Sequence, residues 1–317
     1  MSAVPRSAKI YVSGHRGMVG SALLRRLRAG GYDNLLARTH AELDLTEQYA
    51  VHEFLAVVRP DYMFIAAAKV GGILANNQFR ADFLYRNLMI QANLIHGAHL
   101  AGIDRLMFLA SSCIYPRDAA QPITEEALLT GPLEPTNEPY AIAKIAGVKL
   151  AESYSRQYGR HYGSVMPTNL YGPNDNYDLA SSHVLPALIR KAHDAKGRDD
   201  ARLVVWGTGQ PRREFLYVDD LADACVHLME QGYDGPLVNI GCGEDVSIGE
   251  LAKTVLDVVG CRADIVFDRT RPDGTPQKLL DVSRLAALGW RARTPLRDGI
   301  ARAYMAAPFH PAAPSTP

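Results

Sequence analysis

The sequence has no net charge, because 34 lysine and arginine residues balance 34 aspartate and glutamate residues. A balanced chain has no overall field to attract nucleic acid or an anionic membrane surface, so we expect neither as a partner. No apolar run approaches the length of a membrane span, and the start of the chain lacks the long apolar segment of a signal peptide. These absences predict a cytoplasmic location.

Cysteine is scarce and scattered. The four cysteines, Cys113, Cys225, Cys242 and Cys261, have no CxxC spacing, which argues against a zinc site or a disulfide framework. We therefore expect no metal and a reducing compartment. Cys225 lies in an apolar helical pattern and is predicted to be core, whereas Cys113 stands in SSCIYP, where a strand should end.

Short β-rich runs alternate with longer helical patterns, which is typical of a parallel sheet flanked by helices. We predict an α/β fold, with a Rossmann-like doubly wound parallel sheet and a smaller, discontinuous α/β substrate-binding domain. Thr46 is expected to cap the second helix. The expected strands are 9–13, 34–38, 62–66, 105–110 and 163–166, and the expected helices are 18–28, 46–58, 82–101 and 140–158.

The pattern becomes less regular after residue 170. The run 214–217 looks buried and leads into a helical pattern at 219–229, so we expect this piece to return to the first sheet. We therefore predict a cofactor domain of residues 1–170 and 213–243, and a substrate domain of residues 171–212 and 244–317.

The heptapeptide GHRGMVG, residues 14–20, follows the first predicted strand and opens the first predicted helix. Glycines at such a turn let the backbone approach a diphosphate, which then sits on the helix N-terminus. The spacing is one residue longer than GxGxxG at its first step, but the strand–turn–helix context favours a dinucleotide. Arg38 and Arg16 stand where a 2′-phosphate would be held, which favours NADPH/NADP over NADH.

Tyr140 and Lys144 begin a predicted helix, so their side chains share one face a turn apart. A nearby ammonium favours the phenolate and makes the phenol a usable acid–base group. Ser111 ends another predicted strand and can hydrogen-bond a substrate oxygen. A lone YxxxK is common, but its combination with Ser111 and the glycine turn predicts an oxidoreductase site.

Several stretches resemble the extended short-chain dehydrogenase/reductase family, and the resemblance covers nearly the entire chain. They are GHRGMVGSAL, SSCIYP, EPTNEPYAIAKIAG, MPTNLYGPNDNY, SSHVLPALIRK and REFLYVDDLADA. The segment from Ser111 to Lys191 is similar to the subgroup that epimerises GDP-4-keto-6-deoxy-D-mannose at carbons 3 and 5 and reduces its 4-keto group with NADPH. The resemblance implies a Ser111–Tyr140–Lys144 reduction triad, with Cys113 and His183 carrying epimerisation.

Inverting a carbon beside a ketone requires a base on one face and an acid on the other. Residues two apart in a strand point the same way, so we expect Ser111 and Cys113 to face one pocket. Neighbouring positive charge should lower the thiol pKa and make Cys113 the base, and His183 would then be the opposing acid. Ser111 and Tyr140 would stabilise the enolate oxygen.

The predicted ligand contacts extend this site. The expected cofactor contacts are Gly14, His15, Arg16, Gly17, Met18, Val19, Gly20, Arg38, Leu109, Ala110, Ser111, Ser112, Tyr140, Lys144, Pro167, Thr168, Asn169, Leu170 and His183. The expected substrate contacts are Lys191, Trp206 and Arg213, with Asp273 and Lys278 as further candidates. Trp206 could stack on the base or fill the core of the second domain.

The same resemblance implies a homodimer, because the predicted helices 82–101 and 140–158 are similar to those that pair as a four-helix bundle in this family. Two other functions stay open. One is another nucleotide-sugar enzyme, although Ser112 and Cys113 replace the acidic pair of the dehydratases and a simple 4-epimerase needs no thiol–imidazole pair. The other is a non-catalytic NADP sensor, which would commonly lose the tyrosine that stands here at position 140.

Overall fold

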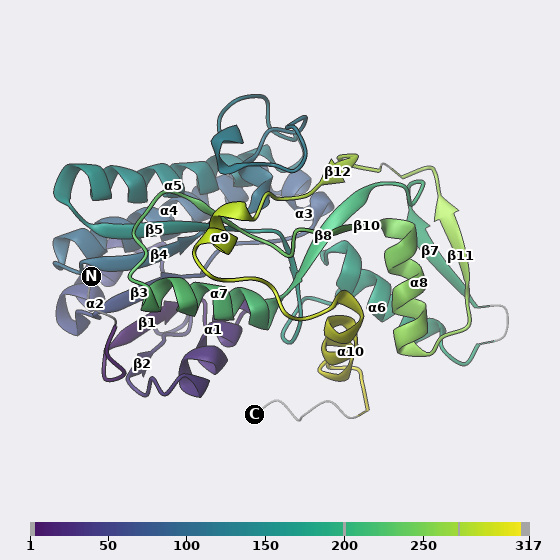
Figure 1. Ribbon diagram of the computed structural model, residues 1–317, viewed down its shortest axis with the longest axis horizontal. Helices are drawn as coiled ribbons and strands as arrows, with labels where there is room; N and C mark the ends of the chain where they lie inside the picture. The colour runs from purple at the N-terminus through teal and green to yellow at the C-terminus, as the bar shows by residue number, and fades with distance from the viewer. Residues whose placement is uncertain (1–3, 199–200, 272, 312–317) are drawn as a thin grey trace.

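The larger unit of the protein is built on a central sheet of six parallel strands (Figure 1). The computed structural model describes residues 4–198, 201–271 and 273–311. The strand order is β2 (Leu35–Leu36), β1 (Ile10–Ser13), β3 (Tyr62–Ile65), β4 (Arg105–Leu109), β5 (His161–Pro167) and β9 (Val238–Ile240). This order confirms the predicted Rossmann-like, doubly wound sheet.

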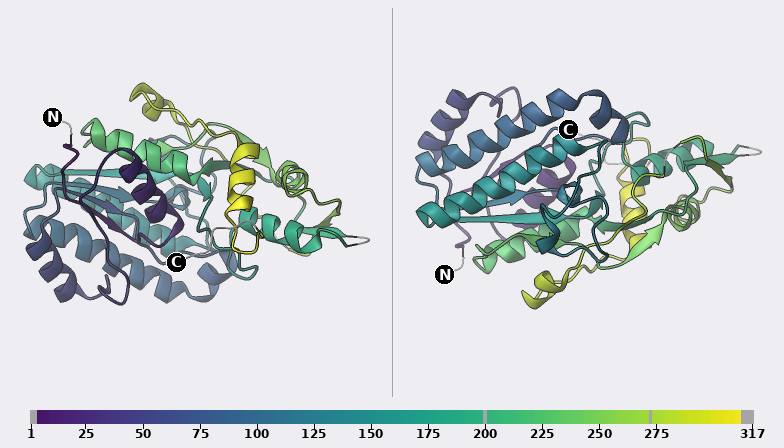
Figure 2. Two further views of the ribbon diagram at one scale, coloured as in Figure 1. Left: turned by 90° about the horizontal axis from the view of Figure 1, so that it is seen from below. Right: turned by 90° about the horizontal axis from the view of Figure 1, so that it is seen from above.

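Helices cover both faces of this sheet (Figures 1 and 2). One face carries α1 (Met18–Ala29) and α7 (Val218–Glu230), and the other carries α2 (Gln48–Val58), α4 (Arg80–Leu100) and α5 (Glu138–Tyr158). Side chains alternate between the two layers along each strand: Val12 and Phe64 pack toward α1 and α7, whereas Tyr11 and Met63 pack toward the other helices. Both sides of each strand are therefore apolar, as in other buried parallel sheets.

The chain leaves β1 for β2 on one side and then returns to β3 on the other side of β1. Such a reversal opens a crevice at the carboxyl ends of the strands, where ligands of this fold class bind. The short elements at this edge are α3 (Ile73–Gln78) and the 3₁₀ helices η1 (Ser112–Ile114) and η2 (Glu125–Ala127).

A second, smaller unit lies at the right of Figure 1. Its central strand β8 (Arg212–Tyr217) pairs with β6 (Asn169–Tyr171), β10 (Asp245–Ser247) and β12 (Gln277–Lys278), and β7 (Arg202–Trp206) pairs with β11 (Asp264–Asp268). The helices of this unit are α6 (Val184–Ala195), α8 (Ile248–Val259) and α10 (Leu296–Met305), whereas the short α9 (Ser283–Ala287) packs against β9 of the first sheet. A separate apolar core joins α6, α8 and α10 with β7 and β8.

The structure corrects two local expectations. The run 214–217 does not return to the first sheet, because β8 pairs only within the second unit; α7 and β9 make the return instead. Thr46 does not cap α2, because its hydroxyl donates to Asp44 (2.8 Å) and Glu47 takes the N-cap position without a side-chain bond. The prediction that Cys225 is core is confirmed, since its side chain is fully buried.

None of the helices in the described ranges is long and apolar enough to cross a bilayer.

A fully buried carboxylate, Glu214 of β8, joins segments that are far apart in sequence. It accepts hydrogen bonds from the backbone N–H groups of Gly243 (2.8 Å) and Leu280 (3.0 Å). The backbone carbonyl of Glu214 accepts from the side chains of Thr168 (3.3 Å) and Asn169 (2.8 Å). One residue therefore fixes β8 against the ends of β5, β9 and β12.

The buried side chain of Asn239 in β9 also connects segments that are far apart in sequence. Its amide nitrogen donates to the carbonyls of Ile123 (2.9 Å) and Asp281 (3.0 Å), and its oxygen accepts from the hydroxyl of Tyr115 (2.6 Å). Because every polar atom of the amide is paired, the chain around residue 280 is held against the loop that follows η1.

We predict that Glu214→Ala lowers the free energy of unfolding by about 3 kcal/mol, because the N–H groups of Gly243 and Leu280 would lose their acceptor. Glu244→Ala, in an exposed glutamate of the adjoining loop, is the matched control and should change it by less than about 0.5 kcal/mol. Urea titration followed by circular dichroism measures both. Equal effects of the two substitutions would contradict the role of Glu214.

Candidate active site

The glycine turn between β1 and α1 has a shape that would let a ligand approach its backbone closely. Gly14 has a φ of 76°, and its carbonyl accepts from the N–H of Gly17 at 3.0 Å. A Cβ on Gly20 would collide with the carbonyl oxygen of Gly14, so glycine is needed where α1 meets the turn. Gly17 caps α1 without a side-chain bond, and the first turn of α1 holds no acidic residue. These features fit a dinucleotide diphosphate at the helix N-terminus.

Arg38 and Arg16, the two arginines assigned to the 2′-phosphate, both lower the pKa of the Glu42 carboxyl. The guanidinium of Arg38 lies 5.3 Å from the ring centre of Phe54 and donates to the carbonyl of Ala37 at 2.8 Å. The pKa of the Glu42 carboxyl is lowered, first by the N–H and hydroxyl of Thr39 and then by the charges of Arg38 and Arg16. Both cations thus lie near one carboxylate beyond β2, which fits an NADP site.

The other predicted cofactor residues lie at the carboxyl ends of neighbouring strands. Leu109, Ala110 and Ser112 are buried where β4 ends, and Pro167, Thr168, Asn169 and Leu170 follow the end of β5. His15, Met18 and Val19 are partly buried in the glycine turn and the first turn of α1. Parallel strands present these ends on one edge, so the predicted contacts share one side of the sheet.

Lys144 lies buried beside Tyr140. Its ammonium donates to the carbonyl of Leu109 at 2.8 Å and lies 4.7 Å from the ring centre of Phe108 and 5.9 Å from that of Tyr140. Burial lowers the pKa of Lys144 to about 8. Because α5 and the end of β4 both hold this side chain, its position follows from the packing of the fold.

Ser111 and Tyr140 meet as predicted. The Ser111 hydroxyl hydrogen-bonds Tyr140, and the edge of Phe83 packs 6.4 Å from the tyrosine ring centre. Burial, and then the thiol of Cys113, raise the pKa of the phenol, and the Ser111 bond lowers it only in part. The expectation that Lys144 favours the phenolate is therefore wrong for the protein without ligands, where Tyr140 keeps its proton.

Cys113 joins the same cluster, but by a different geometry from the predicted one. Residues 111–113 do not continue β4: Ser111 is extended and caps η1, which contains Cys113. The thiol is nonetheless hydrogen-bonded to Ser111, and the positive charges of Lys278 and Lys144 act to lower its pKa. A 3₁₀ turn instead of a strand thus brings the two side chains together.

The pKa of Cys113 also differs from the expectation. Burial raises it above its ordinary value, and the opposing charges of Lys278 and Lys144 with the Ser111 bond offset this only in part. The positive charge is present as predicted, but desolvation is the larger effect. Cys113 therefore rests as a neutral thiol.

His183 occupies the N-cap position of α6 without a side-chain capping bond, and its side chain is exposed. Desolvation lowers the pKa of the imidazole. The ring is therefore accessible to a ligand, while its surroundings favour the neutral form.

Two predicted substrate cations lie next to each other in the second unit. Arg213 and Lys278 are partners in the parallel pairing of β8 with β12. Burial lowers the pKa of both groups, and the charge of Arg213 further lowers that of Lys278. Like charges at paired positions repel each other, so the arrangement is suited to an anion such as a diphosphate.

Trp206 does not fill the core of the second unit, because 42% of its surface is exposed. The ammonium of Lys191 lies 5.9 Å from its ring centre and donates to the carbonyl of Val204 at 2.9 Å. Arg271, which the sequence reasoning missed, lies 5.0 Å from the same ring centre. The only signal for Arg271 was its place in the arginine-rich stretch before Asp273.

Asp273 has a structural partner. Its carboxylate accepts from the backbone N–H (2.6 Å) and the hydroxyl (2.9 Å) of Thr208, in the turn that follows β7. It also favours the charged form of Arg213. Asp273 therefore links the Trp206 end of this region to the Arg213–Lys278 pair.

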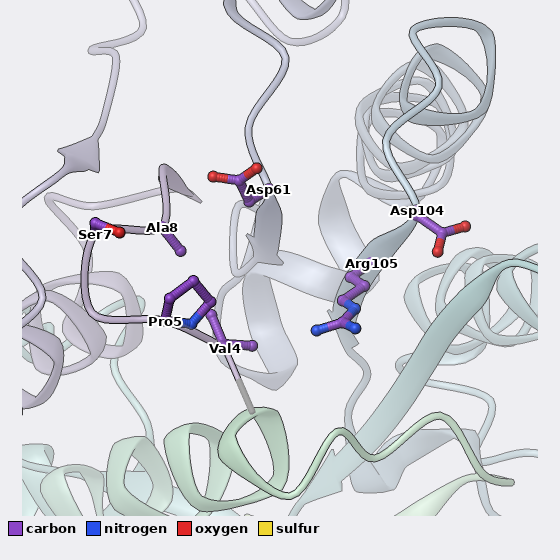
Figure 3. Close-up of a pocket in the computed structure, with 7 residues that line it drawn as sticks. All are labelled: Val4, Pro5, Ser7, Ala8, Asp61, Asp104 and Arg105. Atoms are coloured by element: carbon purple, nitrogen blue, oxygen red, sulfur yellow. The ribbon is translucent and has the colours of Figure 1, made fainter. Parts of the chain in front are cut away.

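A separate hollow lies at the opposite edge of the sheet (Figure 3). Its walls include Val4, Asp61 and Asp104, which precede β1, β3 and β4, together with Arg105. Because it opens at the amino ends of the strands, it is remote from the candidate site.

Comparisons with known proteins show the family of the chain. The sequence profile described as "NAD dependent epimerase/dehydratase family" matches residues 10–241. The chain is 57% identical over 299 residues to a putative GDP-L-fucose synthase 2 of Arabidopsis thaliana, covering 94% of this chain and 91% of that protein. It is 54% identical over 305 residues to the GDP-L-fucose synthase of Escherichia coli K12, covering 93% and 95%.

Among solved structures, the GDP-L-fucose synthetase of Naegleria fowleri bound to NADP superposes with a TM-score of 0.88 at 28% identity, covering 96% of this chain and 93% of that one. The chain therefore belongs to the NAD dependent epimerase/dehydratase family.

Proposed function

We propose that this protein is a GDP-L-fucose synthase. It epimerises GDP-4-keto-6-deoxy-D-mannose at carbons 3 and 5 and then reduces the 4-keto group with NADPH. The observation that carries the proposal is the meeting of Cys113 with Ser111 and Tyr140 above the buried Lys144, because this places an epimerisation base beside a reduction triad. Extensive identity to proteins of that name supports the substrate and the cofactor.

In each epimerisation, the thiolate of Cys113 takes a proton from the carbon next to the ketone. The resulting enolate oxygen accepts hydrogen bonds from Ser111 and Tyr140. His183, in its protonated form, returns a proton to the opposite face of that carbon. The thiol then gives its proton to solvent and the imidazole regains one, so the net change is inversion.

In the reduction, Tyr140 donates its proton to the carbon-4 oxygen. When bound, NADPH would supply the hydride. Lys144 donates to the carbonyl of Leu109 beside the phenol, and its positive charge would stabilise the phenolate left once Tyr140 has given up its proton. The raised pKa of Tyr140 suits this role, because the group enters the step as an acid.

Binding is divided between the two units. Gly14, Gly17 and Gly20 with the start of α1 would hold the cofactor diphosphate, and Arg16 and Arg38 its 2′-phosphate. Arg213 and Lys278 would hold the GDP diphosphate, and Trp206 with Lys191 the base. We keep the division into 1–170 with 213–243 and 171–212 with 244–317 as a proposal. Within 213–243, β8 pairs in the second sheet, whereas α7 and β9 return to the first.

We further propose a homodimer in the cytoplasm. Helices α4 and α5 run side by side on one face of the first unit (Figure 2). Large side chains on them, Tyr85, Ile142 and Tyr158, are exposed by 62%, 43% and 51%. Their burial in a four-helix bundle would remove this apolar surface from water.

Cys113→Ser should slow the entry of solvent deuterium at carbons 3 and 5 about a hundredfold, because a serine hydroxyl is a far weaker base near neutral pH. The affinity for NADPH should not change. Proton NMR of the sugar in deuterium oxide measures the exchange. Cys261→Ser is the matched control, since Cys113 and Cys261 are each 7% exposed. Normal exchange in Cys113→Ser would rule out the thiol as base.

Tyr140→Phe should lower the rate of NADPH oxidation about a thousandfold, because the carbon-4 oxygen loses its proton donor. Deuterium exchange at carbons 3 and 5 should continue. Absorbance at 340 nm follows the reduction, and Tyr85→Phe, in an exposed tyrosine, serves as the control. Full reduction by Tyr140→Phe would contradict the triad.

Arg38→Asp should raise the Kd for NADPH roughly thirtyfold, which corresponds to about 2 kcal/mol, and leave the Kd for NADH nearly unchanged. The reason is the loss of a charged partner for the 2′-phosphate. Fluorescence titration measures both constants. The exposed Arg262 gives the control Arg262→Asp. An unaltered preference between the two coenzymes would refute the assignment.

A further inference from the structure

A segment that no step above uses joins the cofactor end of the site to His183. We call residues 66–76 the strap. At its start, the N–H of Ala67 donates to the hydroxyl of Ser13 at 3.4 Å, and a Cβ on Gly14 would lie 2.8 Å from Ala67. The strap therefore begins directly against the glycine turn.

The middle of the strap is clamped to α4. Asn87, which is 2% exposed, accepts from the N–H of Lys69 at 2.9 Å and donates to its carbonyl at 3.0 Å. The Lys69 ammonium lies 5.5 Å from the ring centre of Phe83, the residue that packs on Tyr140. Both backbone groups of Lys69 are thus held by one buried amide.

The end of the strap is held by Asn76, which is 6% exposed. Its side-chain nitrogen donates to the carbonyls of Gly71 (2.6 Å) and Gly72 (3.1 Å). Its side-chain oxygen has no partner among the described residues. A buried polar atom without a partner costs free energy, so an asparagine here needs a reason beyond filling space.

The glycine that Asn76 holds, Gly72, contacts the segment that leads into α6 of the second unit. The N–H of Gly72 donates to the carbonyl of Ser181 at 2.9 Å. A Cβ on Gly72 would lie 2.9 Å from the carbonyl oxygen of Ser182 and 3.1 Å from that of Ser181. Ser181 is also bound through its N–H (3.0 Å) and hydroxyl (2.9 Å) to Asp178. His183 follows two residues later, where α6 begins.

We propose that Asn76 is a positioning residue for His183: it fixes Gly71 and Gly72, and Gly72 fixes Ser181 and so the start of α6. This inference rests on the proposed function, since it assigns Asn76 to the delivery of the second proton in epimerisation. The strap thereby ties the placement of the acid to the unit that binds the cofactor.

The role has a signature that a general loss of stability would not give. Cys113 exchanges the carbon-bound hydrogen with solvent on its own face, and this step does not need His183. Inversion needs a proton from the other face, and a misplacement of about 1 Å can cost a hundredfold in rate. Loosening the strap should therefore lower inversion more than exchange.

The test compares Asn76→Ala with Asn77→Ala, which makes the same change at the next, exposed position of α3. NMR in deuterium oxide measures deuterium entry and the appearance of inverted sugar in the same sample. We expect Asn76→Ala to lower the ratio of inversion to exchange by roughly tenfold or more, and Asn77→Ala to leave the ratio as in the wild type. An unchanged ratio in Asn76→Ala would overturn the proposal.

Two further variants keep the test decisive if Asn76→Ala folds poorly. Gly72→Ala leaves Asn76 intact but displaces Ser181 and Ser182, so it should lower the same ratio. In a His183→Gln background, Asn76→Ala should lower the rate of inversion by a further factor of less than about two. The reason is that the effects of two substitutions are not additive when one residue acts through the other. Additive effects, or a normal ratio in Gly72→Ala, would refute the positioning role. A wild-type protein that neither exchanges nor inverts the sugar would instead refute the proposed function.

Discussion

The buried carboxylate of Glu214 holds the two units in one arrangement. It sits on β8, the central strand of the second sheet, yet its partners Gly243 and Leu280 follow β9 and β12. Asn239 fixes the same stretch of chain against the loop that follows η1. The consequence for the site is direct, because this stretch brings Lys278 to the thiol of Cys113. Removing the carboxylate would loosen the contact of Lys278 with Cys113 as well as the second sheet.

Burial sets the charge state of the whole cluster. It raises the pKa of Cys113 and Tyr140 and lowers that of Lys144, Lys278 and His183, so each group is moved toward its neutral form. A GDP-sugar and NADPH would bring several negative charges into this region. The cations would then gain partners, and the balance between thiol and thiolate would depend on where those charges lie.

The fold, and the gathering of Ser111, Cys113, Tyr140 and Lys144, could be predicted from the sequence, because they depend on local patterns. Short continuous apolar runs mark the strands, and the glycine spacing fixes the first turn. Long-range pairing could not be predicted: the apolar run at 214–217 fits either sheet, and only its partners place β8. The position of Cys113 in η1, the missing cap at Thr46 and the polar bonds of Asn76 likewise depend on contacts with distant segments.

The burial of Cys113 also affects the durability of the enzyme. Oxidants and electrophiles attack the thiolate, and a sulfur that stays protonated in a site without ligands reacts slowly with peroxide. At 7% exposure, the Cys113 residue is shielded as well as neutral. The burial that keeps the thiol protonated therefore also protects it from irreversible oxidation.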